Sequence, residues 1–278
     1  MYRELPTLGV GLGYRRPLRG GIFQHRDQIE FLELIADHYL SPTHEQEEEL
    51  DLLATHFPLV PHGIGLSLGS AEGLDPGYLR DLGRLVRRLN PPWWSEHVSF
   101  TRAGGIDIGH LSPMPFTWEA VHVLHRNIGA VQSAIDAPFL LENVAYLVRL
   151  PGAEMSEAQF IGEVAERCNC GLLLDITNLY ANSTNHGYDA HAFLDALPMD
   201  RVVQLHFAGG HWVDDVLVDS HSQPTHREVW ELMEEVLGRT PNVAGAVLER
   251  DENLPAVEAL VEELDHARQI GQRCGRWD

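Results

Sequence analysis

The 278-residue chain contains no lysine, because all 20 of its basic residues are arginines. This absence excludes a lysine Schiff base and the phosphate-binding lysine of a Walker motif, whatever the fold. Basic charge is also scarce overall, since 41 Asp and Glu residues give a formal net charge of −21. Nucleic-acid-binding proteins usually present a basic stripe to the phosphate backbone, so the composition argues against that class. It leaves metal enzymes open.

Cysteines are few, and they form no recognisable framework. Cys168 and Cys170 make a C-x-C pair near the end of a predicted helix, and Cys274 stands alone near the C-terminus. No second pair completes a zinc knuckle, and three cysteines do not make a disulfide framework. We therefore expect free, structural thiols.

Long hydrophobic runs are missing as well. No window approaches the roughly 18 apolar residues that a membrane-spanning helix needs. The first residues, MYRELPTLGVGLGYR, lack the basic segment and apolar run of a signal peptide. The sequence also shows no linker, low-complexity tract or short-period repeat. We predict a cytoplasmic protein with a single domain spanning residues 1–278.

Short apolar runs alternate with helix-forming segments along the whole chain. The runs are 8–14, 29–36, 57–68, 93–100, 138–147, 171–180, 202–209 and 244–251. Helix starts are marked by Thr43 with Gln46, Asp75 before Pro76, Ser156 with Gln159, and Asp189. Apolar strands that alternate with helices indicate a parallel sheet covered by helices. Eight such units predict an α/β fold, the (β/α)8 TIM barrel.

A doubly wound open sheet is the alternative architecture. It would usually carry a glycine-rich phosphate turn after its first strand. The glycines Gly9, Gly11 and Gly13 have the wrong spacing for that turn and lie inside the first run. Alternating glycines within a strand instead indicate a close backbone approach or a bend, which favours the barrel.

Polar side chains gather at the ends of the predicted strands. Six runs place a histidine or a carboxylate at or near the C-terminal end of a strand: His62, His97, Glu142, Asp175, His206 and Glu249. Further polar residues follow the sixth and seventh runs: Asn178, His186, His211, Asp219 and His221. In a barrel these strand ends converge on the catalytic face.

The stretch VDSHSQPTHREVWELM (218–233) explains how two of these residues reach that face. Pro224, together with Thr225 and Glu228 in capping-box spacing, predicts a helix start. Asp219 and His221 then lie in the loop between the seventh strand and this helix.

A single His or Glu at a strand end is more often a satisfied polar group than a ligand. Their joint occurrence is harder to explain in that way, because carboxylates packed together repel unless a proton or a cation lies between them. Histidines with Asp and Glu and no cysteine suit iron, manganese or zinc. The number of candidate ligands exceeds what one ion can use, so two or three ions with bridging carboxylates are predicted.

As an ordered set, the motifs GVGLGYR, VPHGIGLSLGS, SEHVSF, LLENVAYL, DITNLYANSTNHGYD, QLHFAGGHW, VDSHSQP and LERD resemble a known family. It comprises the multinuclear non-haem iron-dependent oxidative enzymes and includes the methanobactin biosynthesis oxidase. The resemblance runs from about residue 8 to residue 265. It implies a TIM barrel with two or three iron ions, in mixed Fe(II) and Fe(III) states, at its mouth. It also implies O2 as co-substrate and oxidation of residues, often cysteine, in ribosomally made precursor peptides.

The resemblance also implies roles for individual residues. The implied iron ligands are His62, His97, Glu142, Asp175, Asn178, His206, Asp219, His221 and Glu249. His186 and Asp219 are the residues to which it assigns catalytic roles, with His186 near the cluster and assisting with substrate or proton transfer. Many family members require a separate peptide-recognition protein, which we expect here as well.

The function predicted from the sequence is therefore oxidative modification of a precursor peptide. Two other classes stay open at this stage. One is a divalent-metal-dependent hydrolase or sugar isomerase on a similar barrel, which would use the same residue types without a redox metal. The other is a metal or peptide carrier that binds without turnover.

Overall fold

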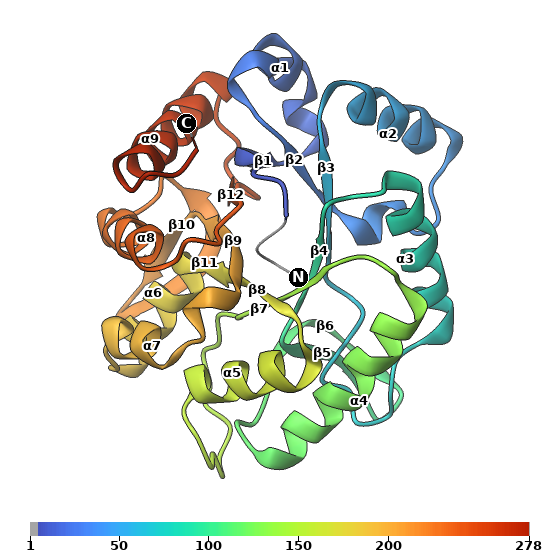
Figure 1. Ribbon diagram of the computed structural model, residues 1–278, viewed down its shortest axis with the longest axis vertical. Helices are drawn as coiled ribbons and strands as arrows, with labels where there is room; N and C mark the ends of the chain where they lie inside the picture. Colours follow the sequence, from blue (N-terminus) through green and yellow to red (C-terminus); the bar gives the residue numbers. More distant parts are fainter. Residues whose placement is uncertain (1–4, 278) are drawn as a thin grey trace.

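Eight parallel strands close into a barrel in the computed structural model, which describes residues 5–277 (Figure 1). Around the barrel the order is β1, β12, β9, β8, β7, β4, β3 and β2. Their bounds are β1 Gly9–Gly13, β2 Leu32–Ile35, β3 Leu59–Gly63, β4 Trp94–His97, β7 Phe139–Glu142, β8 Gly171–Asp175, β9 Val202–Phe207 and β12 Gly245–Leu248. Each strand lies within one of the eight predicted runs, so the TIM barrel is confirmed. The predicted limits 1–278 include residues 1–4 and 278, which lie outside the described part.

Helices cover the outside of the barrel and form a ring around the strands (Figure 1). They are α1 Arg19–Gln24, α2 His44–His56, α3 Pro76–Leu89, α4 Trp118–Ala134, α5 Glu157–Cys168, α6 Ile176–His186, α7 Ala190–Ala196, α8 Arg227–Arg239 and α9 Val257–Arg273. Short 3-10 turns lie at Arg16–Leu18, Arg26–Gln28, Ala36–Tyr39 and Met199–Arg201. Within residues 5–277, no helix is long and apolar enough to cross a membrane.

Local capping explains why several helices begin where they do. Thr43 and Ser156 form complete capping boxes at the starts of α2 and α5, as predicted. Asp75 and Asp189 accept hydrogen bonds from backbone N–H groups in the first turns of α3 and α7. These side chains satisfy amides that have no partner inside the helix.

The predicted capping box at Thr225 is wrong. His226 is the N-cap of α8 and makes no side-chain cap. The backbone N–H and the hydroxyl of Thr225 instead donate to Glu263 on α9, at 2.8 and 2.7 Å. A carboxylate from a helix distant in sequence therefore replaces the local partner that the spacing indicated.

Strand alternation divides the core into two parts. A large cluster fills the space between barrel and helices, and a smaller one holds Phe31, Val60, Trp93, Leu140, Leu173, Val203, Ala244 and Val247. Successive side chains on a strand point to opposite faces. Leu140 belongs to the smaller cluster while Leu141 belongs to the larger one, so the smaller cluster fills the barrel interior. Residues two positions further along each strand also point inward.

Two hairpins that the sequence did not predict follow β4 and β9. They are β5 Ser99–Ala103 with β6 Ile106–Pro113, and β10 Gly209–Val213 with β11 Val216–Gln223. Asp219 and His221 lie within β11, so their placement in an irregular loop is corrected. Both residues still belong to the connection between the seventh barrel strand and α8.

The glycines of β1 allow another residue to lie close to the strand backbone, as their spacing indicated. A Cβ atom on Gly11 would lie 2.7 Å from the ring of Phe31. The aromatic ring therefore occupies the space that a side chain would need.

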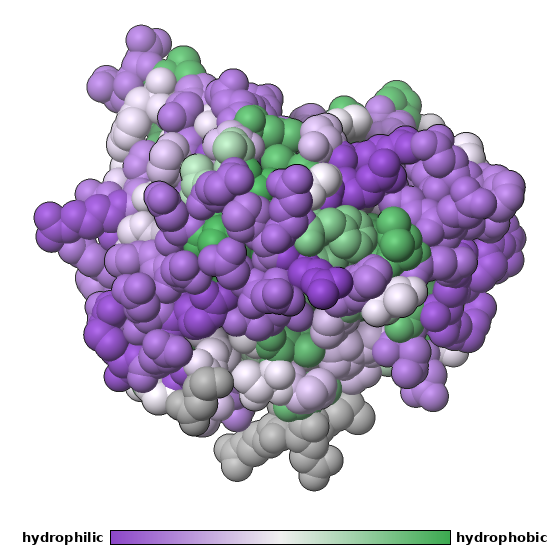
Figure 2. All heavy atoms as spheres, turned by 90° about the horizontal axis from the view of Figure 1, so that it is seen from above, coloured by the Kyte–Doolittle hydropathy of each residue, from purple (hydrophilic) through white to green (hydrophobic). Residues whose placement is uncertain are grey.

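The surface reflects the acidic composition of the chain. On the face drawn in Figure 2, hydrophilic residues surround smaller hydrophobic patches. Among the described residues, the exposed large apolar side chains include Ile106, Leu147, Val148 and Trp212. Each of these four lies in a connection that follows a barrel strand, on the same side as the site described next.

Candidate metal centre

A cavity of about 600 Å³ opens at the C-terminal ends of the barrel strands. Of the predicted ligands it is lined by His62, His97, Glu142, Asp175, Asn178, Asp219, His221 and Glu249. His206 is fully buried beneath them, in contact with Glu142 and Glu249. The structure thus brings all nine predicted ligands to one place. Strand alternation explains much of this, because Glu142 and Asp175 stand two residues after the interior residues Leu140 and Leu173.

A first group of donor atoms comes from His62, His97 and Glu142. The Nε2 atoms of the two histidines lie 3.3 and 3.1 Å from Glu142 Oε2. The three donor atoms lie within 4.8 Å of one another, which is compatible with a single metal ion. All three side chains are buried.

A second group contains Glu142, Asp175, His206 and Glu249. His206 Nδ1 lies 3.0 Å from Glu142 Oε1 and 3.1 Å from Glu249 Oε2. Glu142 therefore belongs to both groups, offering one oxygen to each. A carboxylate placed in this way could bind one cation through each oxygen.

Asp219 and His221 extend the donor set toward the cavity mouth. His221 Nε2 lies 2.9 Å from Asp219 Oδ1, and His221 has a positive φ of 49°. A histidine in the left-handed region is uncommon and carries some strain. Asn178 stands in the first turn of α6, where its backbone N–H donates to Asp175 at 2.9 Å. This cap places the amide of Asn178 beside the carboxylate.

The histidines of the first group are each held through their Nδ1 atom. His97 Nδ1 donates to the backbone carbonyl of Gly63 at 3.0 Å, and His62 Nδ1 lies 2.7 Å from the Ser95 hydroxyl. The Gly63 carbonyl favours the His97 tautomer that leaves Nε2 without a hydrogen, and the Ser95 hydroxyl can accept from His62 Nδ1 in the same tautomer. Metal-binding histidines show this pattern, because the second nitrogen is fixed by an outer partner.

The other two histidines are fixed by carboxylates. His206 Nε2 lies 2.9 Å from Glu33 Oε1, and His221 Nδ1 lies 2.7 Å from Asp251 Oδ2. The opposite nitrogens, His206 Nδ1 and His221 Nε2, therefore face the centre of the cluster. An outer carboxylate also increases the basicity of the imidazole that it orients.

Unsatisfied atoms concentrate in the same place. Nine buried side-chain N or O atoms of the described residues make no hydrogen bond, and five of them belong to predicted ligands. The five are Glu142 Oε2, Asn178 Oδ1, His206 Nδ1, Asp219 Oδ1 and His221 Nε2. Buried polar atoms without partners are costly and rare. Here they are oxygen and nitrogen atoms with lone pairs, as metal coordination requires.

The electrostatics of the cluster favour a cation. Burial and the negative charges of Asp219 and Glu142 raise the pKa of Asp175 well above its usual range. Burial lowers the pKa of His97, but the charges of Glu142 and Glu96 outweigh it and raise the value to about 9. Without a metal ion, protons held by Asp175 and His97 thus balance part of the negative charge of the cluster. A bound cation would replace those protons.

His186 occupies a different position from the predicted ligands. It is the last residue of α6 and does not line the cavity. Its Nε2 atom donates to the carbonyl of Tyr146 at 2.8 Å, and its ring stacks on the Tyr146 ring with centroids 4.6 Å apart. Tyr146 lines the cavity. His186 therefore supports the cavity wall, and its role in proton transfer stays a prediction.

Several residues at the site were not identified from the sequence. Glu33 and Asp251 orient ligand histidines, while Arg15 and His110 line the cavity. Glu33 had a detectable signal, since it stands two residues after the interior residue Phe31 and interrupts an apolar run. His110 lies on β6 and had none, because its hairpin was not predicted. Arg15 pairs with Asp251.

Replacing Glu33 tests the outer support of His206. We expect Glu33→Gln to lower metal affinity about tenfold or more, because the charged partner of the imidazole is lost. Anaerobic competition with a colorimetric chelator measures this change. Glu30→Gln is the matched control, since Glu30 lies in the same segment and pairs with Arg268 on the outside. Equal affinities for the Glu33 variant and the wild type would show that the contact is only structural.

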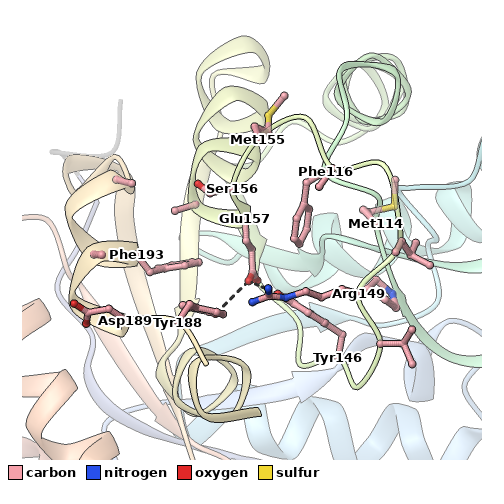
Figure 3. A pocket seen from close by; sticks show the side chains of 17 residues that line it. Met114, Phe116, Tyr146, Arg149, Met155, Ser156, Glu157, Tyr188, Asp189 and Phe193 are labelled. Atoms are coloured by element: carbon pink, nitrogen blue, oxygen red, sulfur yellow. Dashed lines mark hydrogen bonds between the residues drawn. The ribbon is translucent and has the colours of Figure 1, made fainter. Parts of the chain in front are cut away.

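A second cavity of about 380 Å³ adjoins the first. At its centre lies the carboxyl of Glu157, which accepts hydrogen bonds from the hydroxyls of Tyr146 at 2.9 Å and Tyr188 at 3.2 Å (Figure 3). Burial raises the pKa of Glu157 to about 7, although both hydroxyls and the Arg149 charge act in the opposite direction. The carboxyl is thus partly protonated near neutral pH.

This shift predicts a pH-dependent stability difference. The raised pKa means that the protonated Glu157 carboxyl stabilises the folded state. This contribution to the unfolding free energy is complete below pH 4.5 and is lost as the pH rises through 7. Against Glu157→Gln, the wild type should lose about 3 kcal/mol of unfolding free energy across this range. Urea unfolding of both proteins from pH 4.5 to 8 measures it. A constant difference would mean that Glu157 titrates normally.

Comparison with known proteins now decides the family. A model of the family described as RiPP precursor modification enzyme MbnB/TglH/ChrH matches residues 9–272. This chain belongs to that family. Its members modify precursors of RiPPs, which are ribosomally synthesised and post-translationally modified peptides. The match confirms the resemblance found in the motifs.

Relatives of the MbnB/TglH/ChrH chain span nearly its whole length. A UPF0276 protein of Caulobacter vibrioides is 38% identical over 264 residues, covering 95% of this chain and 94% of the relative. A UPF0276 protein of Streptomyces avermitilis is 37% identical over 98% of this chain, which corresponds to 57% of that longer relative.

Solved structures share the barrel. A D-tagatose 3-epimerase-like protein matches with a TM-score of 0.62 and 16% identity, over 95% of this chain and 98% of the other. D-psicose 3-epimerase from Clostridium cellulolyticum matches with a TM-score of 0.57 and 14% identity, over 96% of each chain. At this identity the similarity shows the fold alone.

Proposed function

We propose that this enzyme binds two or three iron ions at the barrel mouth and uses O2 to oxidise a precursor peptide, at a cysteine. Family membership supports a peptide substrate. The donor atoms gathered around Glu142 support a metal centre. The sequence resemblance to iron-dependent oxidative enzymes supports iron and O2.

One observation carries the metal centre. Each of four buried or nearly buried histidines has one nitrogen held by an outer partner and the other directed at the cluster. Five buried ligand atoms make no hydrogen bond within residues 5–277. All of them except Asn178 Oδ1 lie 2.9 to 3.3 Å from a donor atom of another predicted ligand, close enough for one cation to contact both atoms. The residues present therefore fit a multinuclear centre.

The ligand types and their grouping support the choice and number of ions. Imidazole with carboxylate, and without thiolate, suits iron among the redox metals. The two groups that share Glu142 would hold one ion each. Asp219, His221 and the amide of Asn178 would complete the second site or hold a third ion.

When bound, iron supplies a redox couple that allows O2 to accept electrons from the substrate. The chain's own residues do the remaining work. The outer partners Glu33 and Asp251 fix the orientation of two ligand histidines. Asp219 has 18% of its side chain exposed, so we assign it the transfer of a substrate proton to solvent. His186 fixes Tyr146, and the cavity wall formed by Tyr146 limits access of water.

We also propose that the reaction takes place in the cytoplasm and that a separate protein delivers the peptide. The exposed apolar side chains on the connections around the mouth support this view, because a delivered peptide needs a surface to contact. A small open reading frame next to the gene would be the first place to look for the candidate peptide.

Elemental analysis of protein purified without oxygen or added chelator tests the proposal. It is paired with Mössbauer spectra of a sample grown on iron-57. We expect two or more irons per chain and O2 consumption on addition of a candidate peptide. Stoichiometric zinc or manganese, unchanged by anaerobic reconstitution with iron, would contradict the proposed function.

A further inference from the structure

The second cavity lies between α5, α7 and the segment that follows β7. Its walls are mostly apolar and include Met114, Phe116, Val148, Met155 and Phe193. In Figure 3 the rings of Phe116, Tyr146 and Tyr188 surround the Glu157 carboxyl, with Phe193 and Met155 further out. Its volume of about 380 Å³ lies within the range of ordinary ligand pockets.

This cavity continues into the cavity of the metal centre. Pro113, Tyr146 and Val148 line both. The Tyr146 ring stacks on His186 on one side, and its hydroxyl donates to Glu157 on the other. A chain that enters the metal cavity beside the exposed side chain of Val148 would therefore lie within reach of the second cavity.

The polar groups at the centre of the pocket, the Glu157 carboxyl and two tyrosine hydroxyls, bind one another. Both tyrosine hydroxyls donate to the same oxygen of Glu157, and the Arg149 guanidinium lies over the Tyr188 ring at 5.6 Å. These contacts hold the aromatic walls in place. The remaining wall is mostly apolar, and the charged side chains of Arg149 and Asp189 lie at its exposed edge.

We propose that this pocket binds a large apolar side chain, of aromatic or branched aliphatic type, of the same precursor peptide whose reacting residue enters the metal cavity. This inference rests on the proposed function for the identity of the peptide. It adds a specificity site that selects the sequence around the modified residue. The continuity through Tyr146 and Val148 favours this occupant, because a peptide bound along that wall would reach the metal ligands and the second cavity together.

Two alanines on α7 allow the pocket to be filled without disturbing the core. Ala192 and Ala196 are exposed, lie four residues apart and both line the cavity. Ala192→Phe and Ala196→Phe would place a ring in the pocket. Ala196→Ser is the matched control at the same position, because it adds a hydroxyl but changes the side-chain volume little. Ala130→Phe on the exposed side of α4 is the control for adding a ring elsewhere.

The first probe is N-acetyl-phenylalanine amide, with N-acetyl-serine amide as the polar comparison. Ligand-observed saturation-transfer NMR should show binding of the phenylalanine probe to the wild type, Ala196→Ser and Ala130→Phe. We expect affinity about tenfold lower in the two filled variants, since the apolar contact is lost. Binding should be the same in chelator-treated protein. Equal binding of the serine probe, or undiminished binding to both filled variants, would overturn the inference.

A second set of probes joins a thiol to the apolar ring. In N-acetyl-Cys-(Gly)n-Phe amides the spacer varies from none to about three glycines, and one length should bind iron-loaded protein about tenfold tighter than the phenylalanine probe. The gain should disappear in the filled variants and on chelation. If the ring binds but the thiol adds nothing at any spacing, the proposed thiol chemistry fails and the apolar pocket stands. If the thiol binds but the ring adds nothing, the pocket inference fails instead.

Discussion

Glu142→Gln is expected to remove bound metal and to abolish turnover, with a loss of activity above about 100-fold. Glu142 is the one side chain that belongs to both donor groups, and it contacts His62, His97 and His206. The amide keeps the shape of the side chain but loses the charge and one of two equivalent oxygens. Metal content by elemental analysis and O2 consumption with a substrate peptide are the measurements.

The control for this variant is Glu49→Gln. Glu49 is also a buried glutamate, but it pairs with Tyr14 and Arg19 next to α2, away from the cluster. It should retain metal and activity even if stability falls. Full metal content together with normal turnover in the Glu142 variant would rule out its assignment as a bridging ligand.

Removing the metal is expected to lower the melting temperature by about 8 °C or more, for ions bound some thousandfold above their dissociation constants. Without cations, Glu142, Asp175 and Glu249 share one buried cluster. Glu142 Oε2 then has no hydrogen-bond partner to offset its removal from water, and the three carboxylates repel one another where they are ionised. Thermal unfolding by circular dichroism before and after anaerobic chelation measures the difference.

Adding ferrous iron without oxygen should restore the original melting temperature. The Glu142→Gln variant should respond much less to chelation, because it binds less metal at the start. An unchanged melting temperature after complete removal of the metal would mean that the centre is not coupled to folding. The burial of the nine predicted ligands would then need another explanation.

The barrel alone would not have indicated this chemistry. Sugar epimerases share the fold at 14 to 16% identity. The evidence for a metal centre in this chain is the set of side chains at the strand ends and the outer partners that orient them. Function in a TIM barrel lies in such residues, because the scaffold accommodates many different sites.

The sequence by itself determined the eight strands, the starts of four helices and the inward direction of the predicted ligands. These features follow from local physics. Alternation along a strand places Glu142 and Asp175 on the same face as Leu140 and Leu173, and a capping side chain such as Ser156 satisfies amides a few residues away. Such relations extend over a few residues and can be read from neighbouring letters.

Only the tertiary structure decided which partners hold the ligands. Glu33 reaches His206 across 173 positions, Asp251 reaches His221 across 30, and Glu263 replaces the predicted cap of Thr225. The two hairpins, and the continuity of the two cavities through Tyr146, could not be predicted from the sequence either. Closure of the barrel brings these residues together, and no local pattern encodes a contact whose two halves lie on distant strands.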